Sequence, residues 1–255
     1  MPPVPPAPRG PASRSVRPRR LPRRLVQLYL GLWLYGLACA MFVRARLGLD
    51  PWDVLHQGIS ERVGLAIGTV TIVMSAVVLL FWIPLRQRPG LGTISNAVLV
   101  GVSVNVSLEL LPAHAPLWVR WGELLGGIVA LGVATGMYIG ANLGPGPRDG
   151  LMTGLARRTG RSIRLVRTGL ELTVLVVGWL LGGTVGVGTV LFALAIGPLT
   201  QFFLPLFDVR EPGRAAATRP PRRRGRARWR AGRSPSRTPG AGRRSSAAGR
   251  RATRR

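Results

Sequence analysis

Long stretches without a charged side chain alternate with short polar segments through the middle of this 255-residue chain. A bilayer core needs about 20 apolar residues in helical form. The uncharged stretches lie at 25–43, 63–85, 89–108, 124–147 and 172–207, and the last, divided at 182–186, is long enough for most of two spans. The pattern predicts six transmembrane helices, near 25–43, 65–85, 91–111, 121–140, 163–182 and 186–207. A soluble helical protein with these stretches would have almost no polar surface.

One sequence pattern occurs twice, at an offset of 96 positions. Residues 47–58 and 143–154 both read Leu-Gly-x-x-Pro-x-Asp-x-Leu-x-x-Gly, and further matches at this offset extend from about residue 25 to 112. Such self-similarity indicates one structural unit built twice. The predicted organisation is a membrane repeat at 25–112, a linker at 113–120 and a second membrane repeat at 121–208.

Each repeat contains an odd number of predicted spans, three, so the second repeat enters the membrane upside down relative to the first. The fold expected is therefore all-α: a polytopic membrane protein of six transmembrane helices, arranged as two inverted-topology three-helix repeats, each with a short helix after its first span. Secondary transporters commonly use this architecture and place their binding site where the repeats meet.

Charge is concentrated at the two ends of the chain. Seven Arg and no acid lie in residues 1–24, and seventeen Arg lie in 209–255 with Glu211 as the only acid. Both tails lack apolar content and are predicted to be disordered. Arg-rich segments beside a span favour anionic lipid head groups, and a single aromatic residue, Trp229, is too little stacking surface to favour nucleic acid. The Arg distribution predicts that both termini are cytoplasmic.

The duplicated Pro-x-Asp element supplies the main candidate residues, Asp53 and Asp149. In both copies a capping residue and a Pro precede the Asp, which is the pattern of a helix start whose dipole favours a carboxylate. If these short helices lie at the membrane surface, that account is complete. If the segments re-enter the membrane, the two carboxylates lie inside it and become candidates for ion or substrate binding.

Further polar residues inside the predicted spans are weaker candidates. Arg167 and Glu171, four residues apart, can pair on one helix face, either as a buried salt bridge or near the interface. Asn105 and Glu109 share one face of the third span, where they either line a path or serve helix packing.

Glycines and prolines of the repeated elements form a third group. Gly-x-Gly-Thr begins the third and sixth spans, where free backbone N–H groups either receive an anion or belong to tight turns with Thr as a cap. The motif positions singled out are Gly48, Pro51, Gly144, Pro147, Gly186 and Gly188.

On residues 47–58, 143–154 and 182–189, the chain resembles the YczE/YitT group of bacterial integral membrane proteins, and most of all its YczE subgroup. The resemblance covers about 25–208 and implies a six-span protein with duplicated halves in the bacterial inner membrane. It implies no substrate.

The function expected is a transporter or permease-like protein for a small solute or ion. The alternative is a membrane scaffold or regulator that acts through a protein partner. No nucleophile–base pair, metal-ligand spacing or cofactor motif stands out, so an enzyme, a bound metal and a cofactor are not expected. The sequence leaves self-association open.

Overall fold

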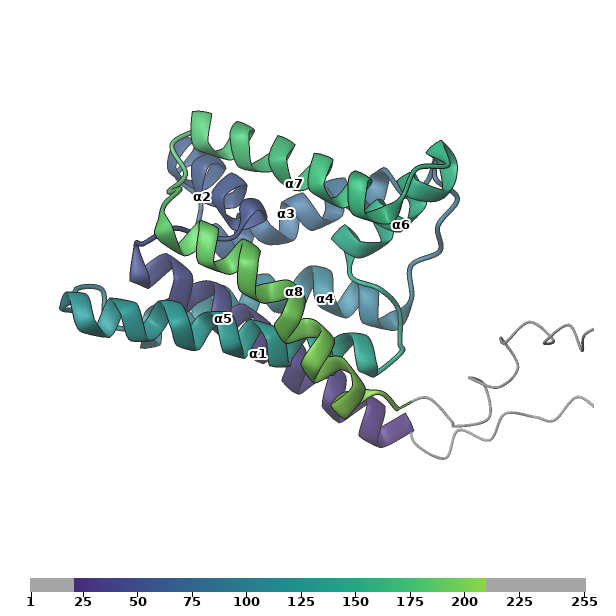
Figure 1. Cartoon of the computed structure of the whole chain (residues 1–255), viewed down its shortest axis with the longest axis horizontal. Helices are drawn as coiled ribbons and strands as arrows, with labels where there is room; N and C mark the ends of the chain where they lie inside the picture. The colour runs from purple at the N-terminus through teal and green to yellow at the C-terminus, as the bar shows by residue number, and fades with distance from the viewer. Residues whose placement is uncertain (1–20, 210–255) are drawn as a thin grey trace, which may run out of the picture. The chain divides into compact units, whose positions relative to one another are not determined.

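The computed structural model describes residues 21–209, and these residues form helices joined by short loops (Figure 1). The chain divides into two units, 1–211 and 212–255, and only the first contains described residues. The predicted lipid-binding tails therefore lie largely outside the described residues. The helices are α1 (Leu21–Ala45), α2 (Pro51–Val63), α3 (Ile67–Leu80), α4 (Leu91–Leu110), α5 (Leu117–Gly140), α6 (Pro147–Thr159), α7 (Ile163–Leu180) and α8 (Val187–Phe207).

A helix lies in each predicted span, although α3 and α7 are not among the helices long and apolar enough to cross a membrane, and α2 and α6 are the predicted short helices. Four helices, α1, α4, α5 and α8, are long and apolar enough to cross a membrane. The segment predicted at 65–85 is shorter, because α3 has only 14 residues. It meets α2 at an angle of 114°, and the pair together would make a fifth span or a re-entrant loop. The expected number of six spans therefore stays a prediction.

Two predicted boundaries move by a few residues. α1 begins at Leu21, inside the segment predicted to be a disordered tail, and α5 begins at Leu117, inside the predicted linker. The reason is the same in both cases. Each extension carries an arginine, Arg24 or Arg120, whose side chain binds the end of another helix.

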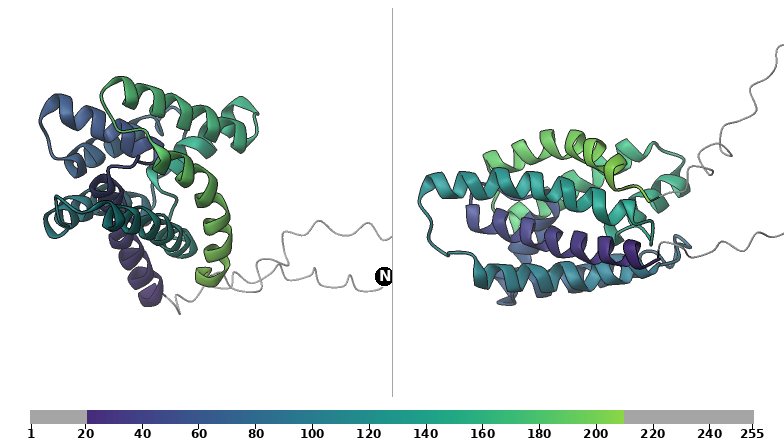
Figure 2. Two further views of the ribbon diagram at one scale, coloured as in Figure 1. Left: turned by 60° about the vertical axis from the view of Figure 1, so that its left-hand side comes forward. Right: turned by 90° about the horizontal axis from the view of Figure 1, so that it is seen from below.

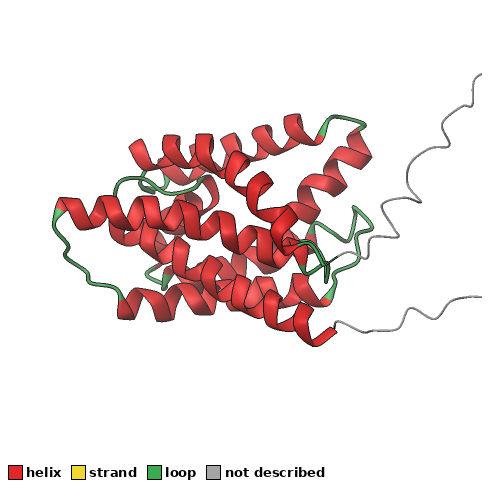
Figure 3. Cartoon of the chain, turned by 60° about the horizontal axis from the view of Figure 1, so that its bottom comes forward, coloured by secondary structure: helices red, strands yellow, loops and turns green. Residues whose placement is uncertain are grey.

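The helices form two layers. One is a row in the order α4, α1, α5, α8, visible from below in Figure 2. The other layer, formed by α2, α3, α6 and α7, lies on one side of this row, above it in the view of Figure 1. α1 and α5 make the most extensive contact of the bundle. Figure 3 shows the described residues as helices and connecting loops, without a strand.

The central helices α1 and α5 are antiparallel, and each caps the other. Arg24 at the start of α1 donates hydrogen bonds to the carbonyls of Ala141 and Asn142 after α5. Arg120 at the start of α5 donates hydrogen bonds to the carbonyls of Ala45 and Arg46 at the end of α1. The last carbonyls of a helix have no partner within the helix, so each arginine satisfies groups of the other half.

Two more contacts occur once in each direction between the halves. The N–H of Gly188 donates to the carbonyl of Leu47 at 2.8 Å, and that of Gly92 donates to Leu143 at 2.9 Å. The Arg62 side chain binds the carbonyl of Leu180, and the Arg158 side chain binds that of Pro84. Each donor and acceptor in one contact is 96 positions from its counterpart in the other. The repeat found in the sequence is therefore also a repeat of contacts.

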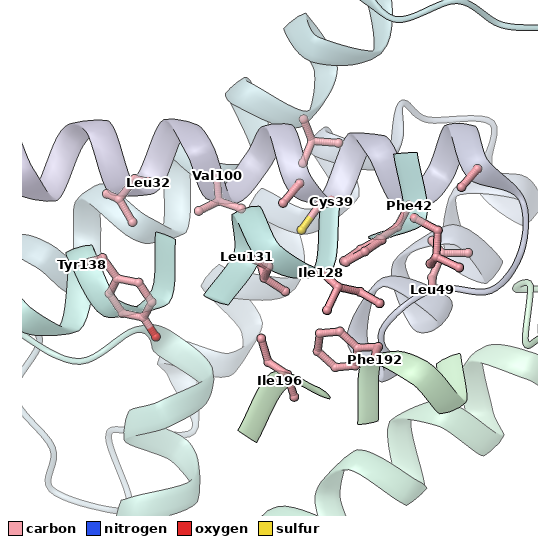
Figure 4. Packing of buried hydrophobic residues seen from close by; sticks show 14 of the residues in the cluster. Leu32, Cys39, Phe42, Leu49, Val100, Ile128, Leu131, Tyr138, Phe192 and Ile196 are labelled. Atoms are coloured by element: carbon pink, nitrogen blue, oxygen red, sulfur yellow. The ribbon is translucent and has the colours of Figure 1, made fainter. Parts of the chain in front are cut away.

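Apolar side chains from both halves fill the space between the central helices. Leu32, Cys39 and Phe42 of α1 are buried together with Leu131 of α5 and Phe192 of α8 (Figure 4). Small residues allow the close approach: a Cβ added at Gly127 would lie 2.9 Å from the Phe42 ring. Small residues at helix crossings are typical of membrane bundles.

The outer faces remain apolar, most of all on α7 and α8. Leu172, Val176 and Trp179 on α7, and Val190 and Leu194 on α8, are exposed by half or more. In the first half, α3 packs closely on α4. The equivalent helices of the second half, α7 and α8, make no comparable contact among the described residues. Exposed apolar side chains in such number indicate contact with lipid or with another protein.

Candidate functional site

The start of α2 is fixed by local capping. The side chain of Asp50 accepts hydrogen bonds from the backbone N–H groups of Trp52 and Asp53, at 2.9 and 3.1 Å. Pro51 occupies the first helical turn, where its missing N–H costs nothing. Gly48 precedes them at φ 119°, and an added Cβ there would lie 2.7 Å from the nitrogen of Gly186. The first motif is thus folded against the start of α8.

The start of α6 repeats this arrangement with different groups. Gly146 takes the place of the capping acid, and Gly144 repeats the turn at φ 129° against Thr93 of α4. The carboxylate of Asp149 accepts a hydrogen bond from the hydroxyl of Tyr138. The indole N–H of Trp82, in the turn after α3, donates to the carbonyl of Pro147 at 3.1 Å. The second motif is held between α3, α4 and α5.

The two helix starts meet each other. The Arg148 guanidinium carbon lies 5.0 Å from the centre of the Trp52 ring, within cation–π range. Trp52 and Arg148 occupy the same position in the two copies of the motif. Contact between equivalent residues places this point where the two halves adjoin.

Charged groups from both motifs gather at this point. Arg148 lies 3.8 Å from an oxygen of Asp50 and 3.6 Å from an oxygen of Asp53. His56 Nδ1 lies 3.2 Å from the same Asp53 oxygen and 3.2 Å from the hydroxyl of Thr71 on α3. Asp50, Asp53 and His56 are almost fully buried. A guanidinium from the second half therefore faces two buried carboxylates from the first.

Each of the two carboxylates keeps one oxygen without a partner. Asp50 Oδ2 and Asp53 Oδ2 are buried and form no hydrogen bond within the described residues. One carboxylate oxygen from each residue and Sγ of Cys39 lie within 4.8 Å of one another. Among the described residues, this is the one group of acidic, His or Cys side chains with the spacing to hold a metal ion.

A small cavity adjoins the charged cluster. It has a volume of about 40 Å³ and lies between Tyr35, Thr71, Tyr138, Arg148 and Asp149. A water molecule needs about 10–15 Å³ by this measure. The cavity therefore has room for an ion or a few waters and not for a larger solute.

The structure brings the two leading candidates to this one place. Asp53 belongs to the buried cluster, and Asp149, half-buried, lines the adjoining cavity next to Arg148. Arg167 and Glu171 form the expected pair, with Arg167 Nε 2.8 Å from Glu171 Oε1, but both side chains are partly exposed, 50% and 29%. Among the described residues, the pair makes no hydrogen bond or ion pair with the cluster, but Arg167 is near enough to Asp149 and Tyr35 of the cavity lining for a charge interaction.

Asn105 and Glu109 of α4 do not line the cavity, although Asn96 of the same helix does. Asn105 accepts a hydrogen bond from the Gly68 N–H at 2.9 Å and so ties α4 to the start of α3. Glu109 is exposed near the end of α4. The Asn105 contact fits the interpretation that these polar residues serve helix packing and not that they line a path.

The repeated glycines and prolines shape the backbone around the cluster. The hydroxyls of Thr93 and Thr189 accept hydrogen bonds from the Gly90 and Gly186 N–H groups, at 3.2 and 3.3 Å. The Gly188 N–H is bonded to Leu47. The Gly-x-Gly-Thr elements are therefore capped turns, as one of the two interpretations predicted.

Sequence reasoning missed several members of the site. His56 and Asp50 lack counterparts in the second copy, and Cys39 and Tyr138 lie in apolar runs. Arg148 was the most visible of these residues in the sequence, because it is the one arginine inside either motif and its equivalent in the first motif is a tryptophan. A charge at an otherwise apolar position of a duplicated motif was the observation to follow.

A second, larger hollow lies elsewhere. It is an open groove of about 650 Å³ between the turn at 83–87 and the end of α6, and Arg86, Arg157 and Arg158 line it. It contains none of the candidate acids. We place the candidate site at the smaller cavity and the charged cluster beside it, because Arg148 lines the cavity and also faces Asp50 and Asp53.

Comparison with known proteins gives a family without an assigned activity. Residues 22–205 match a family of unknown function, DUF6198. An uncharacterised Haemophilus influenzae protein is 41% identical over 177 residues, covering 69% of this chain and 81% of the relative. The uncharacterised membrane protein YczE of Bacillus subtilis is 34% identical over 182 residues, with 69% and 83% covered. No solved structure matches the chain.

Proposed function

The chain belongs to the DUF6198 family, with YczE among its relatives, and we propose that it is a transporter of a small ion or solute in the bacterial inner membrane. The observation that carries the proposal is the cluster of Asp50, Asp53 and Arg148 beside a small cavity. Both halves contribute to it. The homologous membrane protein and the apolar helices of this chain support a multi-pass membrane location.

The depth of the cluster along α1 supports a site inside the bilayer. Tyr35 and Cys39 lie ten and six residues before the end of α1 at Ala45. At 1.5 Å per residue these positions are about 15 and 9 Å from that end. The hydrocarbon core is about 30 Å thick. A helix that spans it carries these residues well within the core, where charged groups are costly and usually functional.

The size of the cavity favours an ion over a larger solute. About 40 Å³ holds a few water-sized atoms. The cluster counts two carboxylates against one guanidinium, so a single bound cation or proton would neutralise it when His56 is neutral. Buried charges are stable only when they are paired. A cation is therefore the substrate, or the coupling ion, that this site fits best.

The proposed topology has two inverted repeats with broken elements at their interface. The antiparallel α1 and α5 and the contacts repeated in both directions support this arrangement. The 114° bend between α2 and α3 is the geometry of a broken span or re-entrant loop. Interrupted helices at the repeat interface are a recurring feature of secondary transporters. Both termini are proposed to be cytoplasmic.

Flux through liposomes tests the proposal. The purified full chain is reconstituted, and uptake of H⁺, Na⁺, K⁺ and Co²⁺ is followed with dyes trapped inside. We expect flux of at least one cation, lost in Asp53→Asn and in Asp149→Asn while both variants still insert and purify. Arg167→Gln and Glu171→Gln should have weaker effects. Glu109→Gln is the control, since Glu109 is exposed and does not line the cavity.

Two results would count against transport. One is the absence of flux for every cation in a protein that is folded and correctly inserted, which would favour the scaffold alternative. The other is full flux in both Asp variants. In that case the motif acids only start helices, a contribution of about 0.3–1 kcal/mol each.

A further inference from the structure

Three potential metal ligands, one from α1 and two from the start of α2, converge beside Arg148. Cys39 lies on α1, Asp50 caps α2, and Asp53 lies in its first turn. The sulfur and one oxygen of each carboxylate lie within 4.8 Å of one another, and all three residues are at least 97% buried. Three such donors rarely share a buried site without a partner that balances them.

The two oxygens of each carboxylate have different surroundings. Oδ1 of Asp50 accepts the backbone hydrogen bonds that start α2, and it is also the Asp50 oxygen that lies 3.8 Å from Arg148. Oδ1 of Asp53 faces His56 and Arg148. The Oδ2 atoms of both residues have no hydrogen-bond partner within the described part of the chain. Protein groups therefore orient each carboxylate through one oxygen and leave the other for a ligand.

We propose that Cys39, Asp50 and Asp53 bind a divalent metal ion of the Zn²⁺ and Co²⁺ class. A thiolate with two carboxylate oxygens suits a borderline-soft ion better than Na⁺, Mg²⁺ or Ca²⁺, which prefer oxygen donors alone. Binding forms one metal–sulfur and two metal–oxygen bonds and releases the thiol proton to solvent. The three anionic ligands and Arg148 then sum to a charge of −2, which the ion neutralises.

The spacing suits a tetrahedral site with one open position. Metal–sulfur and metal–oxygen bonds of about 2.3 and 2.0–2.2 Å place tetrahedral donors about 3.5 Å apart. Donors within 4.8 Å therefore need to approach by about 1 Å. Arg148 faces Oδ1 of both Asp50 and Asp53, and His56 faces Oδ1 of Asp53. Such contacts orient the side chains that bind a metal ion. Three protein ligands leave a fourth position for water or substrate.

The second half does not repeat the donor set. The positions equivalent to Cys39 and Asp50 are Thr135 and Gly146, and Asp149 is bonded to Tyr138. One ion per chain is therefore expected. The inference rests on the same cluster as the proposed function. Its test measures binding and not flux, so either can fail while the other holds.

The experiment is a Co²⁺ titration of the purified full chain, followed by thiolate-to-metal charge-transfer absorption. Zn²⁺ itself has no such signal in the visible range, because its d shell is full. Cys39 is the only cysteine in the chain, so any cobalt–thiolate band reports this residue. We expect the band to saturate at one Co²⁺ per chain and to disappear when Zn²⁺ is added.

Asn variants identify the carboxylate ligands. Asp50→Asn and Asp53→Asn should each raise the dissociation constant for Co²⁺ at least tenfold. Asn is as good a helix cap as Asp, so Asp50→Asn removes the ligand charge while keeping the start of α2. Glu109→Gln is the control, because Glu109 is exposed near the end of α4 and belongs neither to the three-donor group nor to the cavity lining, and it should change the constant less than threefold.

Three outcomes would overturn the metal site. The first is a folded protein without a cobalt–thiolate band at millimolar Co²⁺. The second is a band whose affinity is unchanged in both Asp50→Asn and Asp53→Asn. The third is Na⁺ or a proton that raises the unfolding temperature through Asp53 while Co²⁺ does not, which would assign the cluster to a monovalent cation.

Discussion

Removing the Arg148 guanidinium should destabilise the protein more than any other single charge removal in the bundle. Arg148 faces Asp50 and Asp53 at 3.8 and 3.6 Å, and its own side chain is 19% exposed against 4% for each carboxylate. Arg148→Gln leaves two buried carboxylates near each other without a cation. Breaking a buried pair in this way costs about 3–5 kcal/mol. The partial exposure of Arg148 argues for the lower end, about 3 kcal/mol.

The size of the effect can be separated from general damage by a double-mutant cycle. Asp53→Asn alone removes one of two like charges and keeps Arg148 paired with Asp50, so it should cost about 1 kcal/mol. In the double variant Arg148→Gln/Asp53→Asn, the loss should be about 1–2 kcal/mol smaller than the sum of the single losses, as for residues in direct contact. Equilibrium unfolding in detergent, monitored by helical circular dichroism, gives each value.

An internal control has the opposite environment. The Arg167–Glu171 pair is closer, at 2.8 Å, but its side chains are 50% and 29% exposed. Exposed pairs spaced i, i+4 contribute about 0.3–0.5 kcal/mol, so Arg167→Gln should change the stability by less than 1 kcal/mol. If the two arginine variants lose equal stability, or the cycle is additive, the Arg148 cluster is not an electrostatic unit and the argument for a charged site fails.

Three further predictions concern the repeated contacts, the glycine positions and the membrane topology. Arg24→Gln and Arg120→Gln should each cost about 1.5 kcal/mol, because each loses charged hydrogen bonds to the end of the opposite central helix; a loss in only one of them would contradict the equivalence of the halves. Gly48→Ala and Gly144→Ala, at φ 119° and 129°, should each lower the stability by at least about 2 kcal/mol. Gly169→Ala, with open space around it, should instead stabilise α7 by up to about 1 kcal/mol. Thermal unfolding of each variant measures these changes in stability. Reporter fusions should read out, in, out, in, out, in for positions 48, 88, 116, 160, 184 and 212, and the same side for 48 and 160 would exclude inverted repeats.

The sequence predicted the helical fold well because apolar length and self-similarity are both visible without a structure. A helix lies in each of the six predicted segments, but only four of these helices are long and apolar enough to be spans; both short helices begin at the predicted Pro, 51 and 147. The shortness of α3 was less visible. The apolar stretch at 63–85 has the length of a span, but α3 ends at Leu80 and the chain turns at Trp82 towards α6.

The site was only half predictable for a physical reason. Symmetry pointed to Asp53 and Asp149, since a repeat preserves what both halves need. The cluster itself depends on what the halves do not share: Arg148, Asp50, His56 and Cys39. Self-comparison removes such residues from consideration, and only the three-dimensional contact between Trp52 and Arg148 shows that they face one another.

That contact also bears on how such a chain could arise. If the two halves were separate, identical chains that associated in opposite orientations, the residue at this position would meet its own copy. Two arginines would repel there, and two tryptophans would leave the neighbouring carboxylates without a cation. Once duplication joined the halves, each copy could change alone, and tryptophan could stand opposite arginine. Contacts away from this point, such as those of Arg24 and Arg120, had no such conflict and could keep the same residue on both sides.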